Sequence, residues 1–178
     1  MNFIQKYNIN KHLTCFEKRK KTKGIQVCSW EQAENICLLY TFEAPQSLEE
    51  LMKLISLLRK KKNNITLYCC IPKKENTLSD NSADTCFISE KDSRFNGILR
   101  KEKRVVLQKQ SFDILIHLDK EPTLLSLYLS SEIKAKFRIG RSESTRKYNN
   151  LTLYSSNEND DFETFFQSIE QYTRKIIK

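Results

Sequence analysis

The sequence predicts an α/β protein, a three-layer sandwich in which a mainly parallel sheet of about five strands, Rossmann-like or flavodoxin-like, lies between two layers of helices. Residues 112–118 form a largely apolar run of strand length, which is typical of a strand buried on both faces. A helical pattern led by Pro122 and a short strand ending at Gly140 follow it, as expected of a βα unit that leads to a parallel neighbour. The chain has only three glycines and three prolines, which disfavours an all-β fold with many tight turns.

The first segment, residues 1–23, predicts a basic N-terminal helical arm. It carries seven basic residues against one acid, and its sparse apolar side chains suit an amphipathic helix. Such a helix either contacts phosphates or an anionic lipid surface, or is solvated and packs a few apolar groups on the domain; we favour the second interpretation. Residues 24–178 are then expected to form a single α/β domain.

A β-α-β unit follows the arm. Residues 34–42 contain an unbroken apolar run that suits a central strand, and residues 65–71 form the next strand. Between them, Ser47 is predicted to cap a helix that ends near Arg59, with Glu50 completing a capping box. A crossover of this length predicts parallel, right-handed pairing of the two strands.

The middle of the chain carries weaker signals. Residues 73–84 are polar and predict a surface loop, and a short strand is expected around residues 86–89. Asn96-Gly97 predicts a turn. Residues 100–110 suit a short basic helix before the central strand.

Two short strands and a helix close the chain. Residues 137–139 are expected to form an edge-like strand, and residues 151–154 another. The last helix should begin at Asp160 or Asp161 and bury an aromatic stripe that includes Phe165 and Phe166. Such a stripe is core packing far more often than a ligand site.

The cysteines and the hydropathy bound the class of protein. None of the six cysteines belongs to a C-x-x-C pair and the ligand spacing of zinc sites is absent, so we expect reduced thiols and no metal. We predict no signal peptide and no membrane span, and therefore a cytoplasmic protein. Neither a P-loop nor a G-x-G-x-x-G motif occurs, so we predict no nucleotide cofactor.

Ligands of open parallel sheets bind beyond the carboxyl ends of the strands, so the residues just past each apolar run are the candidates for a site. His117 and Asp119 could act as a base and its orienting partner, but residues two apart on a strand need not touch, and we predict no catalytic residue. The loop after Gly140 combines arginines and hydroxyls that suit a phosphate. The candidate ligand or phosphate residues are His117, Asp119, Arg141, Ser142, Ser144 and Arg146.

The formal net charge of +9 points to polyanions where it is clustered. Basic residues cluster in residues 1–23, 91–109 and 134–147. Few aromatic residues lie among them, so contact with an RNA backbone is favoured over base stacking. The candidate RNA-binding residues are Lys18, Arg19, Lys20, Lys21, Arg100, Lys101, Lys103 and Arg104.

From residues 112–119 through the Pro122-led helix to residues 135–140, the chain resembles an uncharacterised family of small Bacteroidota proteins, a family without an assigned activity. More distantly, the segment is similar to the N-terminal Rossmann-like half of heptosyltransferase-type glycosyltransferases, which carry a "DLVIDL" strand, a helix and a "RIG" strand. This chain has His117 where that pattern places an acid, and it stops before the C-terminal domain that holds the nucleotide-sugar. The resemblance therefore implies the fold and no catalytic residue.

The leading functional hypothesis from the sequence is a non-enzymatic cytoplasmic module that contacts RNA or a ribonucleoprotein through its basic surfaces. The alternative is a small Rossmann-like, glycosyltransferase-like domain or enzyme that binds a phosphorylated small molecule at the strand ends. A third hypothesis is a scaffold whose partner is another protein. The sequence leaves open whether the protein is an enzyme, and the balance leans against catalysis.

Overall fold

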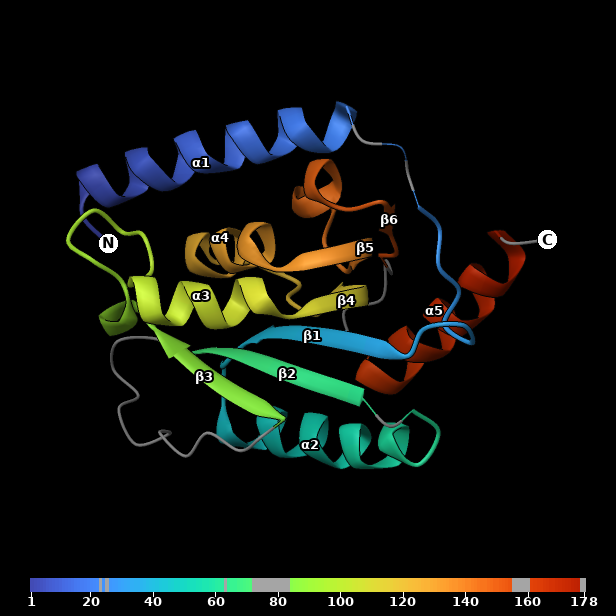
Figure 1. Ribbon diagram of the computed structural model, residues 1–178. Coiled ribbons are helices and arrows are strands. Elements are labelled where there is room, and N and C mark those ends of the chain that lie inside the picture. Colours follow the sequence, from blue (N-terminus) through green and yellow to red (C-terminus); the bar gives the residue numbers. More distant parts are fainter. Residues whose placement is uncertain (23, 25, 63, 72–83, 155–160, 177–178) are drawn as a thin grey trace.

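The computed structural model of the protein describes residues 1–22, 24, 26–62, 64–71, 84–154 and 161–176 (Figure 1). The elements in chain order are α1 (Phe3–Thr22), β1 (Asn35–Thr41), α2 (Pro45–Arg59), β2 (Asn64–Ile71), β3 (Thr85–Ser89), the 3₁₀ helix η1 (Glu90–Asp92), α3 (Lys101–Lys109), β4 (Ser111–His117), α4 (Leu124–Glu132), β5 (Lys134–Gly140), the 3₁₀ helix η2 (Glu143–Tyr148), β6 (Leu151–Thr152) and α5 (Phe162–Ile176).

The six strands form one sheet in the order β3-β2-β1-β4-β5-β6, and all neighbours pair in parallel. The predicted α/β fold with a parallel Rossmann-like sheet is confirmed, with six strands in place of about five. The strand predicted as edge-like at residues 137–139 is wrong in its position. It begins already at Lys134 and lies between β4 and β6, because the two residues of β6 pair with its end.

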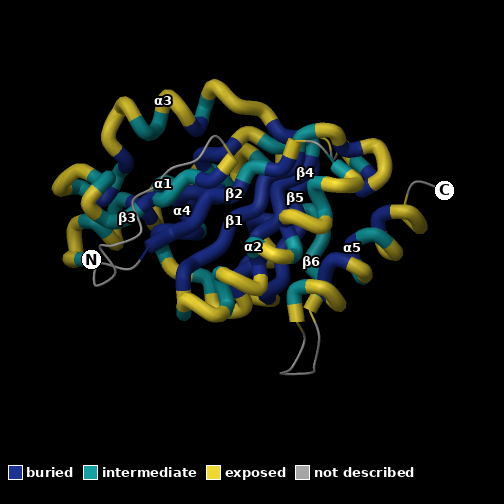
Figure 2. The backbone as a smooth tube through the Cα atoms, turned by 90° about the horizontal axis from the view of Figure 1, so that it is seen from below, coloured by how far each residue is buried: buried dark blue, intermediate teal, exposed yellow. Residues whose placement is uncertain are grey.

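Helices cover both faces of the sheet (Figure 1). Helices α2 and α5 lie on one face, where Ile55 and Phe165 enter a core with the strands. On the other face, α1, α3 and α4 lie over a second core that contains Leu13 and Tyr128. Figure 2 shows the central strands buried and the outer sides of the helices exposed. This two-sided burial explains why the strands are apolar at nearly every position.

Two helix starts differ from the sequence prediction. Helix α2 begins at Pro45, and its N-cap, Ala44, makes no side-chain capping bond, so the predicted Ser47 cap is wrong. The fixed φ of proline suits the first helical position, so the N-cap lies at Ala44, three residues before Ser47. Helix α4 begins after Pro122, because the Thr123 side chain accepts a hydrogen bond from the Ser126 amide at 3.2 Å and forms the cap.

The N-terminal helix packs on the domain. Ile9 and Leu13 of α1 are buried against the core beneath α4. The turn predicted at Asn96-Gly97 is confirmed, and Gly97 has a positive φ of 83° there. Its backbone lies so close to α1 that an added Cβ would stand 2.9 Å from the Gln5 Cβ. The loop therefore supports the first turns of the helix.

Other elements match their predictions to within a few residues. Asp161 accepts a hydrogen bond from the Thr164 amide at 2.7 Å at the start of α5, as predicted for a capping residue. Asp160 and nearly all of the predicted 73–84 loop lie outside the described residues. All six cysteines are free thiols. None of the described helices combines the length and apolar character needed to span a bilayer.

Candidate ligand site at the carboxyl edge of the sheet

Asp119 joins the ends of two central strands. β1 ends at Thr41, and Asp119 follows the end of β4. The Asp119 Oδ1 atom accepts a hydrogen bond from the Thr41 amide at 2.6 Å, and Oδ2 accepts one from Thr41 Oγ1 at 2.6 Å. Both side chains are buried. The carboxylate therefore satisfies the hydrogen-bonding groups of Thr41 at the strand end, which water would otherwise satisfy.

His117 contacts the same carboxylate. Its Nε2 lies 3.1 Å from Asp119 Oδ2 and 3.3 Å from Ser126 Oγ. The spacing alone left this contact open, because residues two apart on a strand point to one side but need not touch. In the structure the strand ends at His117, and the chain beyond it brings Asp119 within hydrogen-bonding distance. His117 and Asp119 are each only 1% exposed, so a substrate outside the fold does not reach this pair.

The pKa of Asp119 reports the balance in this network. Burial acts to raise it, but the hydrogen bond and charge of His117 and the two Thr41 donors outweigh burial and hold the pKa below its ordinary value. The ionised carboxylate is therefore part of the folded state. The network of Thr41, His117, Asp119 and Ser126 positions the strand ends and does not itself form the site.

The loop after β5 folds back over the end of its own strand. An added Cβ at Gly140 would lie 1.9 Å from Asn149 Nδ2 and 2.7 Å from Thr145 Oγ1. Thr145 Oγ1 in turn donates to Ser142 O at 2.6 Å. Glycine is therefore required here for close packing rather than for a special backbone angle.

The predicted residues of this loop separate into two groups. Arg141 is buried and reaches the site, as described below. Ser142 and Ser144 share a hydrogen bond of 2.9 Å, and Arg146 pairs with Glu143 at 3.2 Å on the exposed side of η2. The structure thus brings His117, Asp119 and Arg141 to one edge and leaves the other three in the loop.

A cavity of about 190 Å³, the strand-edge cavity, opens at this edge of the sheet. It lies beyond β1 and β4, between the first turns of α2 and α5. Its lining combines acidic, basic, hydroxyl and aromatic groups. The residues are Tyr40, Glu43, Ser47, Glu50, Leu118, Lys120, Arg141, Asp161 and Phe162.

Arg141 is a firmly positioned cation of the cavity. Its guanidinium carbon lies 5.4 Å from the ring centre of Phe162 and 5.2 Å from that of Phe165. Its Nη2 donates to the Asp161 carbonyl at 3.3 Å. The two rings of α5 favour a cation over their faces, so the guanidinium is held in place before any ligand arrives.

Of the residues that line the cavity, only Arg141 was among the candidate ligand residues predicted from the sequence. Ser47 and Glu50 were assigned to a capping box, but the helix begins earlier and both side chains line the cavity. Because the first turn of α2 lines the cavity, the positive end of the helix dipole lies at this edge, and no side chain caps it there. Lys120 lies next to Asp119 in one of the strand-end segments that the sequence singled out, but it was not named among the candidate residues.

The basic stretches meet at the opposite edge of the sheet. Arg19 and Lys20 of α1, Arg104 of α3 and the start of β5 line a second depression of about 530 Å³, which we call the basic groove. The other five RNA candidates lie outside its lining: Lys18, Lys21, Arg100, Lys101 and Lys103. Lys21 pairs with Glu17 at 2.8 Å and Lys103 with Asp92 at 3.8 Å.

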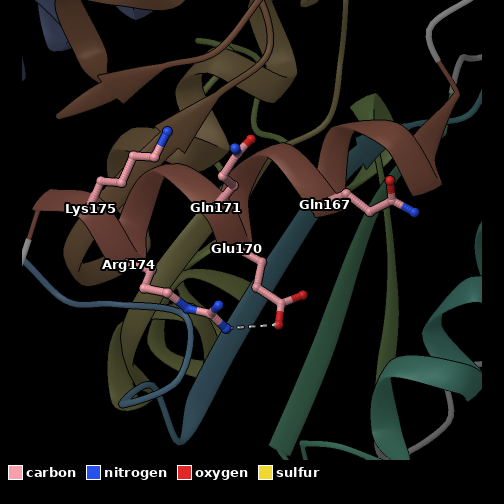
Figure 3. Close-up of a pocket in the computed structure, with 5 residues that line it drawn as sticks. All are labelled: Gln167, Glu170, Gln171, Arg174 and Lys175. Atoms are coloured by element: carbon pink, nitrogen blue, oxygen red, sulfur yellow. Dashed lines mark ion pairs between the residues drawn. The ribbon is translucent and has the colours of Figure 1, made fainter.

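A third hollow of about 390 Å³ lies along α5, and Figure 3 shows its five lining side chains. All of them come from this one helix, and Glu170 and Arg174 pair across one turn at 3.8 Å. A row of side chains on a single helix gives no enclosed surface, so we assign no site to it. Among the described residues, no three His, Cys, Asp or Glu side chains are grouped to hold a metal ion.

The sheet order, the two helical layers and the cavity beyond the strand ends place the protein among α/β domains of the Rossmann-like class. The chain belongs to a family of unknown function (DUF6913), whose model matches residues 2–176. No curated protein matches it.

Among solved structures, the chain is similar to one described as the crystal structure of the glycosyl transferase family 9 from Veillonella parvula DSM 2008. The identity is 17% and the TM-score 0.56, over 80% of this chain and 42% of the other. The chain therefore spans less than half of that protein, and at this identity the similarity shows the fold alone. It agrees with the fold that the sequence resemblance implied.

Proposed function

We propose that this protein is a small-molecule-binding domain whose ligand, a phosphorylated sugar or a similar phosphate ester rich in hydroxyl groups, sits in the strand-edge cavity. The observation that carries the proposal is the cavity itself, whose lining combines Lys120 and Arg141 with Glu43 and Glu50. The position matches the rule for open parallel sheets. The similarity in fold to a glycosyl transferase supports the same class of ligand.

The mixed charge of the lining favours this chemistry over a bare anion. Lys120 and Arg141 suit a phosphate group, because cations give charge-assisted hydrogen bonds to its oxygens. Glu43 and Glu50 accept hydrogen bonds only, so they suit sugar hydroxyls. The uncapped start of α2 adds backbone donors and a favourable dipole for the phosphate.

The size of the cavity limits the ligand. Pockets for drug-sized molecules measure about 300–1,000 Å³, whereas the strand-edge cavity measures about 190 Å³. A monosaccharide phosphate suits this volume better than a dinucleotide does. We propose binding rather than catalysis, because the His117–Asp119 pair is closed off from the cavity.

A thermal-unfolding screen tests the proposal. We expect monosaccharide phosphates to raise the melting temperature, while the matching sugars without phosphate have little effect. Saturation at one hundred times Kd stabilises a protein by about 2.7 kcal/mol. No shift with any sugar phosphate or nucleotide would count against the strand-edge site.

Contact with RNA is a second candidate, and one observation favours it. The three basic stretches, separate in the sequence, converge on the basic groove. Retention of RNA at low salt, lost as salt rises, tests it. Protein released from lysate without nucleic acid, and inert toward added RNA, would contradict it.

Two further statements stay predictions from the sequence. One is a role as a scaffold for another protein, and the other is a cytoplasmic location. None of the structural observations above bears on either. The division into an arm of residues 1–23 and a domain of residues 24–178 is likewise a proposal, and deletion of the arm followed by a folding assay tests it.

A further inference from the structure

The basic groove combines an excess of cations with one acid that is already engaged. The cations that line it are Arg19, Lys20, Arg104, Lys134, Lys136 and Arg138. Among its described lining residues, Glu132 is the one carboxylate, and it accepts hydrogen bonds from Arg104 Nε at 2.7 Å and Gln108 Nε2 at 2.8 Å. Its other oxygen lies 3.0 Å from His12 Nε2. Little of its charge remains for the other cations.

Arg138 forms the floor of the groove. Its guanidinium is buried, and its donors cap the end of α4 by bonding to Ser130 O at 2.6 Å and to Ile133 O. The ring of Phe16 covers it, with the guanidinium carbon 4.9 Å from the ring centre. Within the described part of the chain, no carboxylate pairs with it. Burial lowers its pKa to about 10, as expected of a cation without a counter-charge.

Lys20 reinforces this excess of charge. Its Nζ donates to the Asn149 carbonyl, and Asn150, the next residue, bonds through its Oδ1 to the Arg138 amide at 2.9 Å. The pKa of Lys20 is lowered, first by burial and then by the charge of Arg138. Two like charges therefore lie on the same side of the groove. An anion bound between them would offset the cost of burying each cation and would reduce their mutual repulsion.

The sides of the groove offer cations that a ligand can reach. Lys134 and Lys136 of β5 line the groove together with Arg138. Lys136 pairs with Asp113 at 2.7 Å. Arg19 and Lys134 are exposed, and neither has an ion-pair partner among the residues that the structure describes.

We infer that the basic groove is a phosphate-binding site in which Lys20 and Arg138 hold a phosphate group and Arg19 and Lys134 flank it. The ligand class is a polyphosphate or a phosphate monoester, because a compact, highly charged group suits four converging cations. Its source is either the terminal phosphate of an RNA strand or a free polyphosphate. The RNA source rests on the proposal above that the protein contacts RNA. The free-polyphosphate source is independent of that proposal.

Titration of the full-length protein at low salt tests the site with three probes: inorganic tripolyphosphate, a short RNA with a 5′-phosphate, and the same RNA with a 5′-hydroxyl. The test variant is Lys20→Gln/Lys134→Gln. The matched control is Lys18→Gln/Lys101→Gln, which also removes two charges. Lys18 lies on α1, as Lys20 does, and Lys101 lies on α3, but neither lines the groove. Arg138 is left intact because it caps α4.

We expect at least one phosphate probe to bind to the wild type, with affinity lowered about a hundredfold in the test variant and at most about threefold in the control, because each hydrogen bond to a charged group contributes roughly a factor of ten. Preference for the 5′-phosphorylated RNA over both other probes assigns the site to an RNA end. Binding of tripolyphosphate alone, or as tight as that of RNA, assigns it to a free polyphosphate.

Three results would overturn the inference: no binding of any probe, equal losses in the test and control variants, or equal affinity for 5′-phosphate and 5′-hydroxyl RNA without binding of tripolyphosphate. The last would leave RNA binding in place and remove only the phosphate site. Lys120→Gln leaves the groove unaltered, so it separates failure here from failure of the strand-edge cavity.

Discussion

Both carboxylate oxygens of Asp119 accept a hydrogen bond from Thr41, one from its amide and one from its hydroxyl, each at 2.6 Å. This pair connects the ends of the two central strands, where both residues are buried and an unpaired polar group would be costly. Leu118 and Lys120, the neighbours of Asp119 in the chain, line the strand-edge cavity. The stability of the strand ends beside the proposed site therefore depends on one buried carboxylate.

Replacing this carboxylate should cost much of the stability of the fold. In Asp119→Asn, an amide NH₂ faces a donor of Thr41 or His117, and we expect the free energy of unfolding to fall by about 2–4 kcal/mol. Urea unfolding measures it. Asp84→Asn is the control, because Asp84 is exposed and its 3.5 Å pair with Arg59 should contribute under about 1 kcal/mol. Equal losses in both variants would contradict the role of Asp119.

The pH dependence of stability should show the same group. The pKa of Asp119 is lowered in the folded state, so its contribution is complete above the unfolded value and is lost as pH falls through the folded one. The gap in unfolding free energy between wild type and Asp119→Asn should then narrow as pH falls below about 4. Urea unfolding from about pH 7 to about pH 2.5 measures it. A constant or widening gap would show that the carboxylate is not held in its ionised form.

The end of β5 should reject any side chain. We expect Gly140→Ala to lower the free energy of unfolding by about 2–4 kcal/mol, because the new Cβ meets the buried Asn149 amide, which is itself held by Thr145. Gly24→Ala is the matched control, since nothing lies within 4 Å of an added Cβ there. Thermal unfolding compares the two. A harmless Gly140→Ala would mean that the loop after β5 packs elsewhere.

The cysteines should differ widely in reactivity. Cys15 is exposed, whereas Cys37, Cys69 and Cys70 are buried. Burial raises the pKa of Cys69 to about 12 and raises that of Cys70 as well. With a thiol reagent at neutral pH we expect a fast phase that disappears in Cys15→Ser, and three thiols that react only after unfolding. Rapid reaction of the buried thiols in the native protein would contradict the packing of β1 and β2.

Much of the fold was predictable because strands buried on both faces leave an unmistakable pattern. The apolar runs of β1, β2 and β4 located three strands of the sheet and the parallel topology between them. Helix starts were harder, because two residues compete to begin α2 and the proline prevails over the Ser47 capping box. The two residues of β6 carry too little pattern to show that β5 is an internal strand.

The candidate site was predictable in its place but not in its members. The rule for strand ends located the edge, yet the contact between His117 and Asp119 depends on how the chain leaves the strand, which no spacing encodes. The contribution of Phe162 to the site likewise depends on α5 returning to this edge from the end of the chain. The convergence of the three basic stretches on one groove also arises from the tertiary structure, so it cannot be predicted from the net charge.

The measurement that tests the central claim most directly is calorimetric titration of a monosaccharide phosphate into three proteins: wild type, Lys120→Gln and Lys53→Gln. Lys120 lines the strand-edge cavity, and Lys53 is an exposed cation of α2 outside its lining. We predict binding to wild type and Lys53→Gln with similar Kd, and a Kd raised about tenfold in Lys120→Gln because a charge-assisted bond to phosphate is lost. Absence of binding to the wild type, or the same Kd in all three proteins, would contradict the assignment of the strand-edge cavity as the ligand site.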